Sequence, residues 1–141
     1  MAENAIGCPY PIVKNPRGLF APQKGLNQIQ SDLLILILTN PGERVLMPTY
    51  GTPLRQYMFD QNDTTVANNV RSAIINAINT FEPRIVVSSL TVTNGADPST
   101  LNPQDTRTEV DKILSINLQY YDPGNIQNIQ NLQLEIPLAG S

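Results

Sequence analysis

The apolar residues of this chain follow a helical period in the first half of the sequence and a strand period in the second. Between residues 26 and 39 they recur every three to four positions, and the opposite side of the same segment is apolar as well. The residues of this pattern are Ile29, Leu33, Leu36 and Ile37, with Leu34, Ile35 and Leu38 on the far side. A helix that is apolar nearly all round is expected to be buried. Pro41-Gly42 must end it near Asn40, because proline cannot continue a helix.

Residues 64–81 carry a second, longer helical stripe. Asp63 or Thr64 is expected to cap its N-terminus, and Pro83 stops it. The apolar residues of the stripe are Val66, Val70, Ile74, Ala77, Ile78 and Phe81. We predict that they belong to the core. Upstream of this helix, Thr52-Pro53 is expected to provide the cap and the first residue of a short helix that runs through Phe59.

Alternation with a period of two begins after Pro83 and predicts β-strands. The expected strands are residues 85–93, 110–121 and 132–138. Turns are expected at Asn94-Gly95 and at Asp122-Pro123-Gly124. The positions on one face of the last two strands are Val110, Leu114, Ile116, Leu118 and Tyr120, then Leu132, Leu134, Ile136 and Leu138. Residues 96–108 are rich in Pro, Asp, Asn and Thr, which predicts an exposed loop between the first two strands.

The order of these elements predicts an α+β fold, with two to three helices packed on one face of a mostly antiparallel β-sheet. Helices come first and strands later, without the alternation that a parallel sheet requires. The chain has 141 residues, enough for one packed core. Residues 1–25 contain four prolines and are expected to form an extended arm, with a short edge strand near Gly18–Ala21. Residues 26–141 are expected to form a single domain.

Composition and charge argue against several classes of function. The net charge is −3, from 9 basic and 12 acidic residues, and no cluster of basic residues points to nucleic acid as a partner. Histidine is absent and Cys8 is the single cysteine, so we expect neither an internal disulfide nor a metal site, and no cofactor. The N-terminus lacks a signal pattern, and the longest apolar run, Leu33–Leu38, is too short to span a membrane. We therefore expect a soluble chain that is not exported.

The groups that remain for catalysis are mainly carboxyls. Serine and cysteine triads fail for lack of histidine, and no glycine-rich phosphate loop is present. Glycoside hydrolysis needs two carboxyl groups that flank the scissile bond, and Glu43, Asp60 and Glu82 are the candidates. No pair of them has a recognisable catalytic spacing, and Arg84 close to Glu82 would favour the charged form of that carboxyl over the acid. We expect no catalytic residue.

Two motifs at a defined spacing carry a resemblance to a known family. They are Pro41-Gly42-Glu43-Arg44-Val45 with Pro48, Tyr50, Gly51 and Leu54, and, after a helix, Glu82-Pro83-Arg84 at the start of a strand. This arrangement resembles the baseplate wedge family of contractile phage tails, which includes the T-even sheath initiator, the W protein of P2-like phages and the short baseplate component of type VI secretion. The resemblance runs from about Gly18 to Leu138. Met47 and Thr49 stand where the family often has a basic and an acidic residue.

The resemblance implies a mechanical role in the tail baseplate of a virion that assembles in the host cytoplasm. It implies that Glu82, Pro83 and Arg84 bind the helical core of the wedge, with six copies of the subunit around the tube. It also implies that sheet strands pair with the first ring of the tail sheath, because an open sheet edge is a template for main-chain pairing. The side chains on the candidate sheath-facing strands are Ile116, Leu118, Tyr120, Leu132, Leu134 and Ile136.

The implied partners are other wedge proteins and the tail sheath, with tube or hub proteins as further candidates and without nucleic acid or membrane. Isolated chains are expected to be monomers. Two alternatives stay open: a regulatory binding protein of the anti-adaptor kind on the same fold, and a lysozyme-like hydrolase. Arg84 could also serve only to pair with Glu82. Glu43 and Arg44 are expected to brace their loop, and Gly42 and Gly51 to provide backbone conformations that other residues disfavour.

Overall fold

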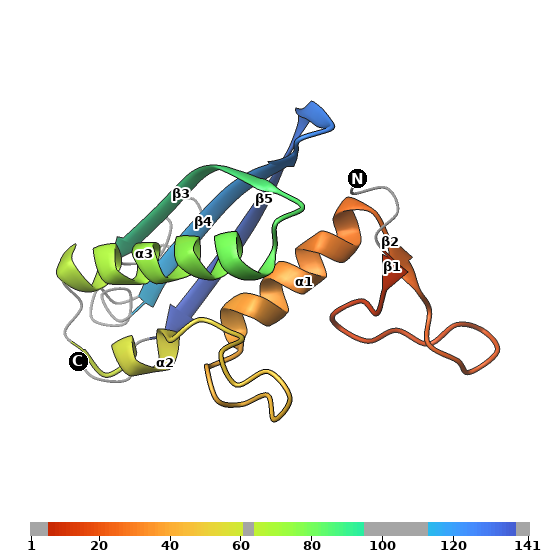
Figure 1. Cartoon of the computed structure of the whole chain (residues 1–141), viewed down its shortest axis with the longest axis horizontal. Coiled ribbons are helices and arrows are strands. Elements are labelled where there is room, and N and C mark those ends of the chain that lie inside the picture. Colours follow the sequence, from red (N-terminus) through yellow and green to blue (C-terminus); the bar gives the residue numbers. More distant parts are fainter. Residues whose placement is uncertain (1–5, 61–63, 95–112, 138–141) are drawn as a thin grey trace, which may run out of the picture.

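The computed structural model describes residues 6–60, 64–94 and 113–137. Its helices and strands follow the predicted order, with helices before the main sheet (Figure 1). In chain order they are β1 (Ile6–Gly7), β2 (Gln23–Lys24), α1 (Leu26–Leu38), α2 (Leu54–Tyr57), α3 (Thr64–Phe81), β3 (Val86–Asn94), β4 (Ile113–Asp122) and β5 (Asn125–Pro137). The α+β fold class is confirmed.

The main sheet is an antiparallel meander in the order β3-β4-β5, so β4 is its central strand. In Figure 1, α3 crosses one face of this sheet and α1 lies near the C-terminal end of α3. Leu118 on β4 pairs with Leu90 on β3 and with Leu132 on β5, which sets three leucines side by side in one row. All three are buried, so this row faces the helices.

The hydrophobic core joins α1, α3 and the inner face of the sheet. Its largest fully buried side chains are those of Tyr120, Ile29, Leu33, Leu36, Ile37, Ile74, Ile78, Leu114, Ile116, Leu118 and Val70. The predicted stripe of α3 is confirmed as core, except that Phe81 is only partly buried. In β4 every second side chain from Leu114 to Tyr120 is buried, which is the period that the sequence pattern predicts.

The prediction that α1 is buried all round is wrong in part. Leu38 is 47% exposed, and Leu34 and Ile35 are half-buried. The described part of the chain packs against one face of α1. The buried residues on that face include two polar ones, Gln28 and Ser31. The opposite face of α1 stays at the surface of the subunit.

The short helix α2 begins differently from the prediction. Pro53 is its N-cap, and the hydroxyl of Thr52 instead donates to the carbonyl oxygen of Leu36 in α1 at 3.2 Å. Thr52 is fully buried, so this bond satisfies a group that water cannot reach. The helix ends at Tyr57, earlier than the predicted Phe59.

Strand β5 is longer than predicted, because it begins at Asn125 instead of Leu132. The asparagine- and glutamine-rich run 125–131 has a low intrinsic preference for strands. It forms one nonetheless, since β4 continues beside it and pairs Gln119 with Asn131 and Tyr120 with Gln130. Predicted positions Val110 and Leu138 and the loop 96–108 lie outside the described residues.

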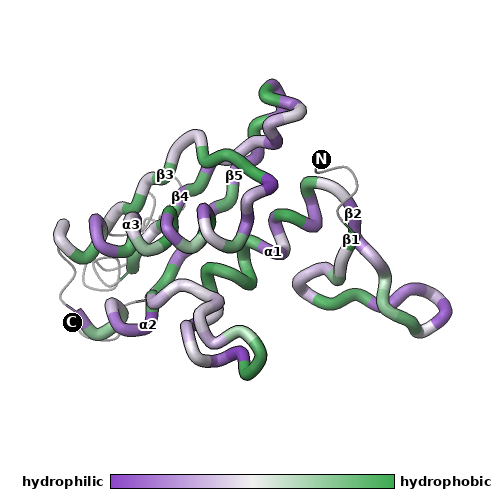
Figure 2. The backbone as a smooth tube through the Cα atoms, in the orientation of Figure 1, coloured by the Kyte–Doolittle hydropathy of each residue, from purple (hydrophilic) through white to green (hydrophobic). Residues whose placement is uncertain are grey.

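The N-terminal arm folds back on itself as a hairpin. β1 pairs with β2, and a single bridge between Lys14 and Phe20 closes the distal part. The edge strand expected at Gly18–Ala21 therefore contributes only the bridge at Phe20. Large apolar side chains of the arm are exposed, and Figure 2 shows apolar segments along it; they are Ile6, Tyr10, Ile12, Val13, Leu19 and Phe20. No helix among residues 6–60, 64–94 and 113–137 is long and apolar enough to cross a membrane.

Candidate functional site

Glu82, Pro83 and Arg84 form the junction between the end of α3 and the start of β3. The backbone N–H of Glu82 still donates to the carbonyl oxygen of Ile78 at 2.8 Å, so the helical hydrogen-bond pattern reaches this residue. Pro83 has no N–H to donate and ends the helix. Glu82 is 5% exposed, whereas the side chain of Arg84 is 35% exposed. The junction therefore holds a buried carboxylate beside a guanidinium that reaches the surface.

Arg84 binds two carboxylates from different parts of the chain. Its Nε and Nη2 atoms donate to the two oxygens of Glu82, the latter at 2.6 Å, and Nη2 also donates to Asp32 Oδ2 at 2.7 Å. The fork geometry matches a bidentate carboxylate pair. The hydrogen bonds that Arg84 donates to Glu82 raise its pKa above the ordinary value, and the bond that it donates to Asp32 adds to the effect. We call Glu82, Arg84 and Asp32 the Arg84 cluster.

Two carboxylates and one guanidinium give the Arg84 cluster a formal charge of −1. Nη1 of Arg84 makes no hydrogen bond to the described residues. The side chain of Asp32 is 30% exposed, so the cluster presents both a donor and an acceptor at the surface. Sequence reasoning missed Asp32. The signal available was that it is the one charged residue in α1, placed within an otherwise largely apolar segment.

The loop between α1 and α2 carries the first motif, and its own contacts hold it in shape. The N–H of Gly42, at φ 92°, donates to the carbonyl oxygen of Pro48 at 2.7 Å and closes the loop. The carboxylate of Glu43 accepts from the backbone N–H and the side-chain amide of Asn40, at 3.1 and 3.2 Å. These bonds hold the pKa of Glu43 below its usual value.

Aromatic stacking connects the motif loop to the end of α3. The guanidinium of Arg44 lies 3.8 Å above the centre of the Tyr50 ring, and that ring lies 5.1 Å from the ring of Phe81 at an angle of 59°. Burial raises the pKa of the Tyr50 hydroxyl. Glu43 and Arg44 thus both contact other residues of the same subunit. At the tip, Val45 and Leu46 are almost fully exposed.

Gly51 lets the chain pass close to the end of α1. Its φ is 122°, and a Cβ atom there would collide with the carbonyl group of Thr39. Next along the chain, the N–H of Thr52 donates to the same carbonyl oxygen at 2.8 Å. Only glycine allows both the positive φ and the close approach to the Thr39 carbonyl at position 51.

The strands predicted to face the sheath differ from the prediction in their place in the sheet and in the burial of their side chains. β4 lies between β3 and β5 and pairs with both, so the prediction that it provides an open edge is wrong. The side chains of Ile116, Leu118, Tyr120, Leu132 and Ile136 are buried in the core, and Leu134 is half-buried. Among the described strands, the outer edges of the main sheet belong to β3 and β5. Any sheath contact of these strands would therefore run through main-chain groups of an edge.

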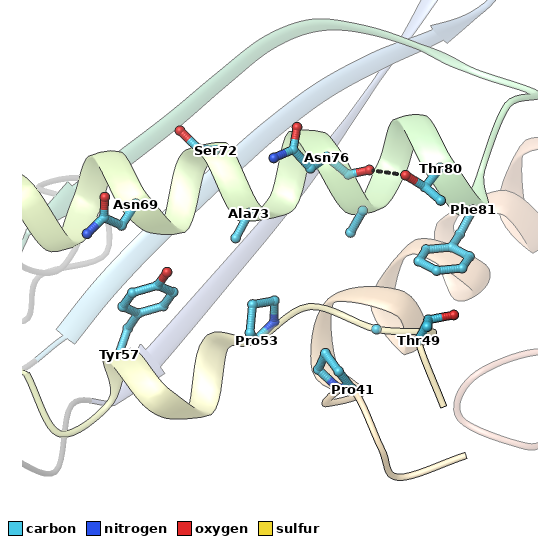
Figure 3. A pocket seen from close by; sticks show the side chains of 12 residues that line it. Pro41, Thr49, Pro53, Tyr57, Asn69, Ser72, Ala73, Asn76, Thr80 and Phe81 are labelled. Carbon is cyan, nitrogen blue, oxygen red and sulfur yellow. Dashed lines mark hydrogen bonds between the residues drawn. The ribbon is translucent and has the colours of Figure 1, made fainter. Parts of the chain in front are cut away.

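A groove of about 570 Å³ lies between α3 and the segment that contains the motif loop and α2 (Figure 3). Small side chains of α3, including Ala73 and Ser72, form one wall, while Pro53 and Tyr57 lie opposite. None of the described residues that line it carries a carboxylate. Glu43 lines a separate cavity of about 380 Å³ together with Glu135. Within the described part of the chain, no group of three His, Cys, Asp or Glu residues could hold a metal ion.

Comparisons with known proteins bear on both motifs. The family described as baseplate wedge protein gp25 matches residues 23–120, which include the motif loop and the Arg84 cluster. No curated protein matches the chain in sequence.

Solved structures show where the fold recurs. A candidate tail lysozyme from Geobacter sulfurreducens is 23% identical, with a TM-score of 0.62 over 79% of this chain and 88% of the other. A chain of the six-fold symmetrised baseplate of the anti-feeding prophage is 16% identical, with a TM-score of 0.61 over 96% and 86%. A chain of the type VI secretion baseplate complex is 13% identical, with a TM-score of 0.54 over 80% and 93%. The chain belongs to the gp25 family of baseplate wedge proteins, structural components of contractile tails.

Proposed function

We propose that this chain holds the core of the baseplate wedge through the Arg84 cluster and starts sheath assembly by strand pairing at an edge of its main sheet. The observation that carries the proposal is the Arg84 cluster itself. A largely buried carboxylate orients a guanidinium whose side chain remains 35% exposed and whose Nη1 has no hydrogen bond to a described residue. The family match, which covers this cluster, supports the baseplate as the setting.

The geometry of Arg84 suits an anchor better than a purely internal ion pair. The bidentate pair with Glu82 uses two of the five N–H donors of the guanidinium, and Asp32 accepts from a third. Three of the hydrogen bonds are fixed within the subunit, which removes most of the rotamer freedom of the side chain before a partner arrives. A preorganised side chain loses less entropy on binding. Nη1 of Arg84 is left to donate to an acceptor on the partner, and the exposed carboxylate of Asp32 favours main-chain N–H groups or a cation beside it.

An edge of the main sheet is the proposed template for the sheath. β5 is the longer edge strand, with 13 residues, and it carries several exposed amide side chains before Leu132. Ile126 and Ile129 are 66% and 54% exposed on the same segment. An edge of this length supports β-augmentation, in which a partner strand adds main-chain hydrogen bonds.

The proposed role is structural and includes no catalysis. Glu43 would have to stay protonated to act as a general acid, but the bonds from Asn40 lower its pKa. Both carboxylate oxygens of Glu82 already accept hydrogen bonds from Arg84, which leaves this group poorly placed to act on a substrate. The likeness to the candidate tail lysozyme is a likeness of fold alone. Family membership likewise favours the baseplate over a regulatory protein of the same fold.

The remaining parts of the proposal concern assembly. We place six copies around the tail tube, next to other wedge proteins, the sheath, and tube or hub proteins. The chain is a monomer before it joins the wedge in the host cytoplasm. The exposed arm and the exposed tip of the motif loop are surfaces that incorporation into such a complex would cover.

The test is the assembly of tails that carry Arg84→Ala, imaged by electron microscopy beside wild type. We expect tubes that lack complete, sheathed baseplates. Arg71→Ala is the matched control, because Arg71 is exposed on α3 and makes no hydrogen bond or ion pair within the described structure. Circular dichroism of the purified variants establishes that both fold. Contractile tails of normal appearance with Arg84→Ala would show that this residue is not the anchor.

A further inference from the structure

A continuous set of hydrogen bonds joins the N-terminal arm to the Arg84 cluster. Gln28 lies one helical turn before Asp32 on α1, and its Nε2 donates to Asp32 Oδ1 at 2.8 Å. The same nitrogen donates to the carbonyl oxygen of Cys8 in the arm at 3.3 Å. Asp32 accepts Arg84 on its other oxygen at 2.7 Å. Two side chains of one helix therefore stand between the arm backbone and Arg84.

The environment of Gln28 fixes the orientation of its amide. Gln28 is 3% exposed, and its Oε1 is buried without a hydrogen bond to any described residue. Turning the amide over would set that oxygen against two acceptors, the Asp32 carboxylate and the Cys8 carbonyl, and would break both bonds. A buried polar atom without a partner calls for an explanation. Here the explanation is that both N–H groups of the amide are committed to the arm and to Asp32.

The arm packs directly on this amide. A Cβ atom at Gly7 would lie 2.5 Å from Nε2 and 2.7 Å from Cδ of Gln28. The absence of a side chain at Gly7 thus allows β1 to approach the amide closely. A separate bond, from the hydroxyl of Ser31 to Oε1 of Gln23 at 3.1 Å, ties β2 to α1 without involving Asp32 or Arg84.

We propose that Asp32 and Gln28 are positioning residues that orient Arg84 and seat the N-terminal arm at the same time, so that the two are energetically coupled. Seating of the arm orders Gln28, which orders Asp32, which restrains the guanidinium. By thermodynamic reciprocity, a partner bound at Arg84 stabilises the seated arm by the same factor. The consequence for assembly rests on the proposed function, whereas the coupling itself is a property of the isolated chain.

Hydrogen–deuterium exchange of the purified protein tests the coupling. Arg84→Gln leaves every arm residue in place, and Arg84 donates no hydrogen bond to the arm in the described structure. We expect it nevertheless to speed exchange in β1 and β2 by about threefold or more, within the range of coupling between side chains of one network. Gln28→Met should do the same. The controls Arg71→Gln and Gln30→Met should leave exchange in the arm unchanged.

Gly7→Ala tests the effect of the arm on Arg84, because the added Cβ atom in the arm displaces the amide of Gln28. We expect it to shift the Nε–H resonance of Arg84 in NMR spectra, while Ser31→Ala, which loosens the arm by the independent bond, shifts it much less. Unchanged arm exchange in Arg84→Gln would overturn the coupling, and so would an Arg84 resonance that moves no further in Gly7→Ala than in Ser31→Ala.

The same experiments separate this inference from the proposed function. If arm exchange rises in Arg84→Gln while Arg84→Ala tails assemble normally, the coupling stands and the anchor does not. If Arg84→Ala blocks assembly but arm exchange is unchanged, the anchor stands and the coupling is wrong. If both hold, Gln28→Met tails should show a partial assembly defect that Gln30→Met tails lack.

Discussion

Replacing Leu118 by alanine distinguishes a core position from a docking position. Leu118 is fully buried on the central strand, between Leu90 and Leu132, which are each 4% exposed. The change removes about three carbon groups at roughly 0.8 kcal/mol each, or about 2.5 kcal/mol. The rigid neighbours cannot collapse fully into the space, and with this cavity contribution we expect a total loss of about 3–4.5 kcal/mol in the free energy of unfolding.

Urea denaturation of the purified protein, followed by circular dichroism, measures this loss. Ile129→Ala is the control, because Ile129 lies on the edge strand β5 and is 54% exposed; its effect should stay below about 1 kcal/mol. Leu118→Val provides a milder change if the alanine variant is unfolded at the outset. A loss below about 1 kcal/mol for Leu118→Ala would refute the placement of this side chain in the core and would restore it as a candidate contact with the sheath.

Further predictions concern the motif loop and the response to pH. Gly51→Ala should destabilise the protein by about 3 kcal/mol or more, since it combines backbone strain with a collision against Thr39. Gly42→Ala should cost about 1 kcal/mol, because the added atom there meets open space. Equal melting temperatures for the two variants would contradict this. Burial raises the pKa of Tyr120 from 10.0 to about 12. The unfolded chain therefore loses its proton first, so the stability that the neutral hydroxyl provides is full below pH 10 and falls as the pH rises towards 12. Urea titrations at about pH 9 and about pH 11 should show a smaller pH-dependent loss in Tyr120→Phe than in wild type, and equal losses would argue against the raised pKa.

Local sequence signals sufficed for most elements of the fold. The period of the apolar residues located α1, α3 and β4. Burial of one face imposes a spacing of three to four residues on a helix and of two residues on a strand. Local signals failed where contact with another segment of the chain determines the local structure. The amide-rich run 125–131 forms half of β5 because β4 offers it a partner, and Thr52 bonds to α1 instead of capping α2 because the loop returns to that helix.

The candidate site was accessible from the sequence only in part. Glu82-Pro83-Arg84 could be recognised because its members are adjacent in the chain. Asp32 could not be assigned to the site, since 52 positions separate it from Arg84 and its place as the one charged residue of α1 does not indicate which residue it contacts. The same holds for Gln28, whose contact with Cys8 depends on how the arm folds back.

The sequence by itself determined the fold class, the order of the elements, the core face of α3 and β4, and the two motifs that mark the family, because these depend on residue spacing and on the chemistry of neighbours. The tertiary structure decided which strand is central and which is an edge, and therefore which strands offer main-chain groups to another protein. It also decided which residues surround Arg84, because packing of α1 against the end of α3 brings Asp32 to the guanidinium, a contact that no local pattern encodes.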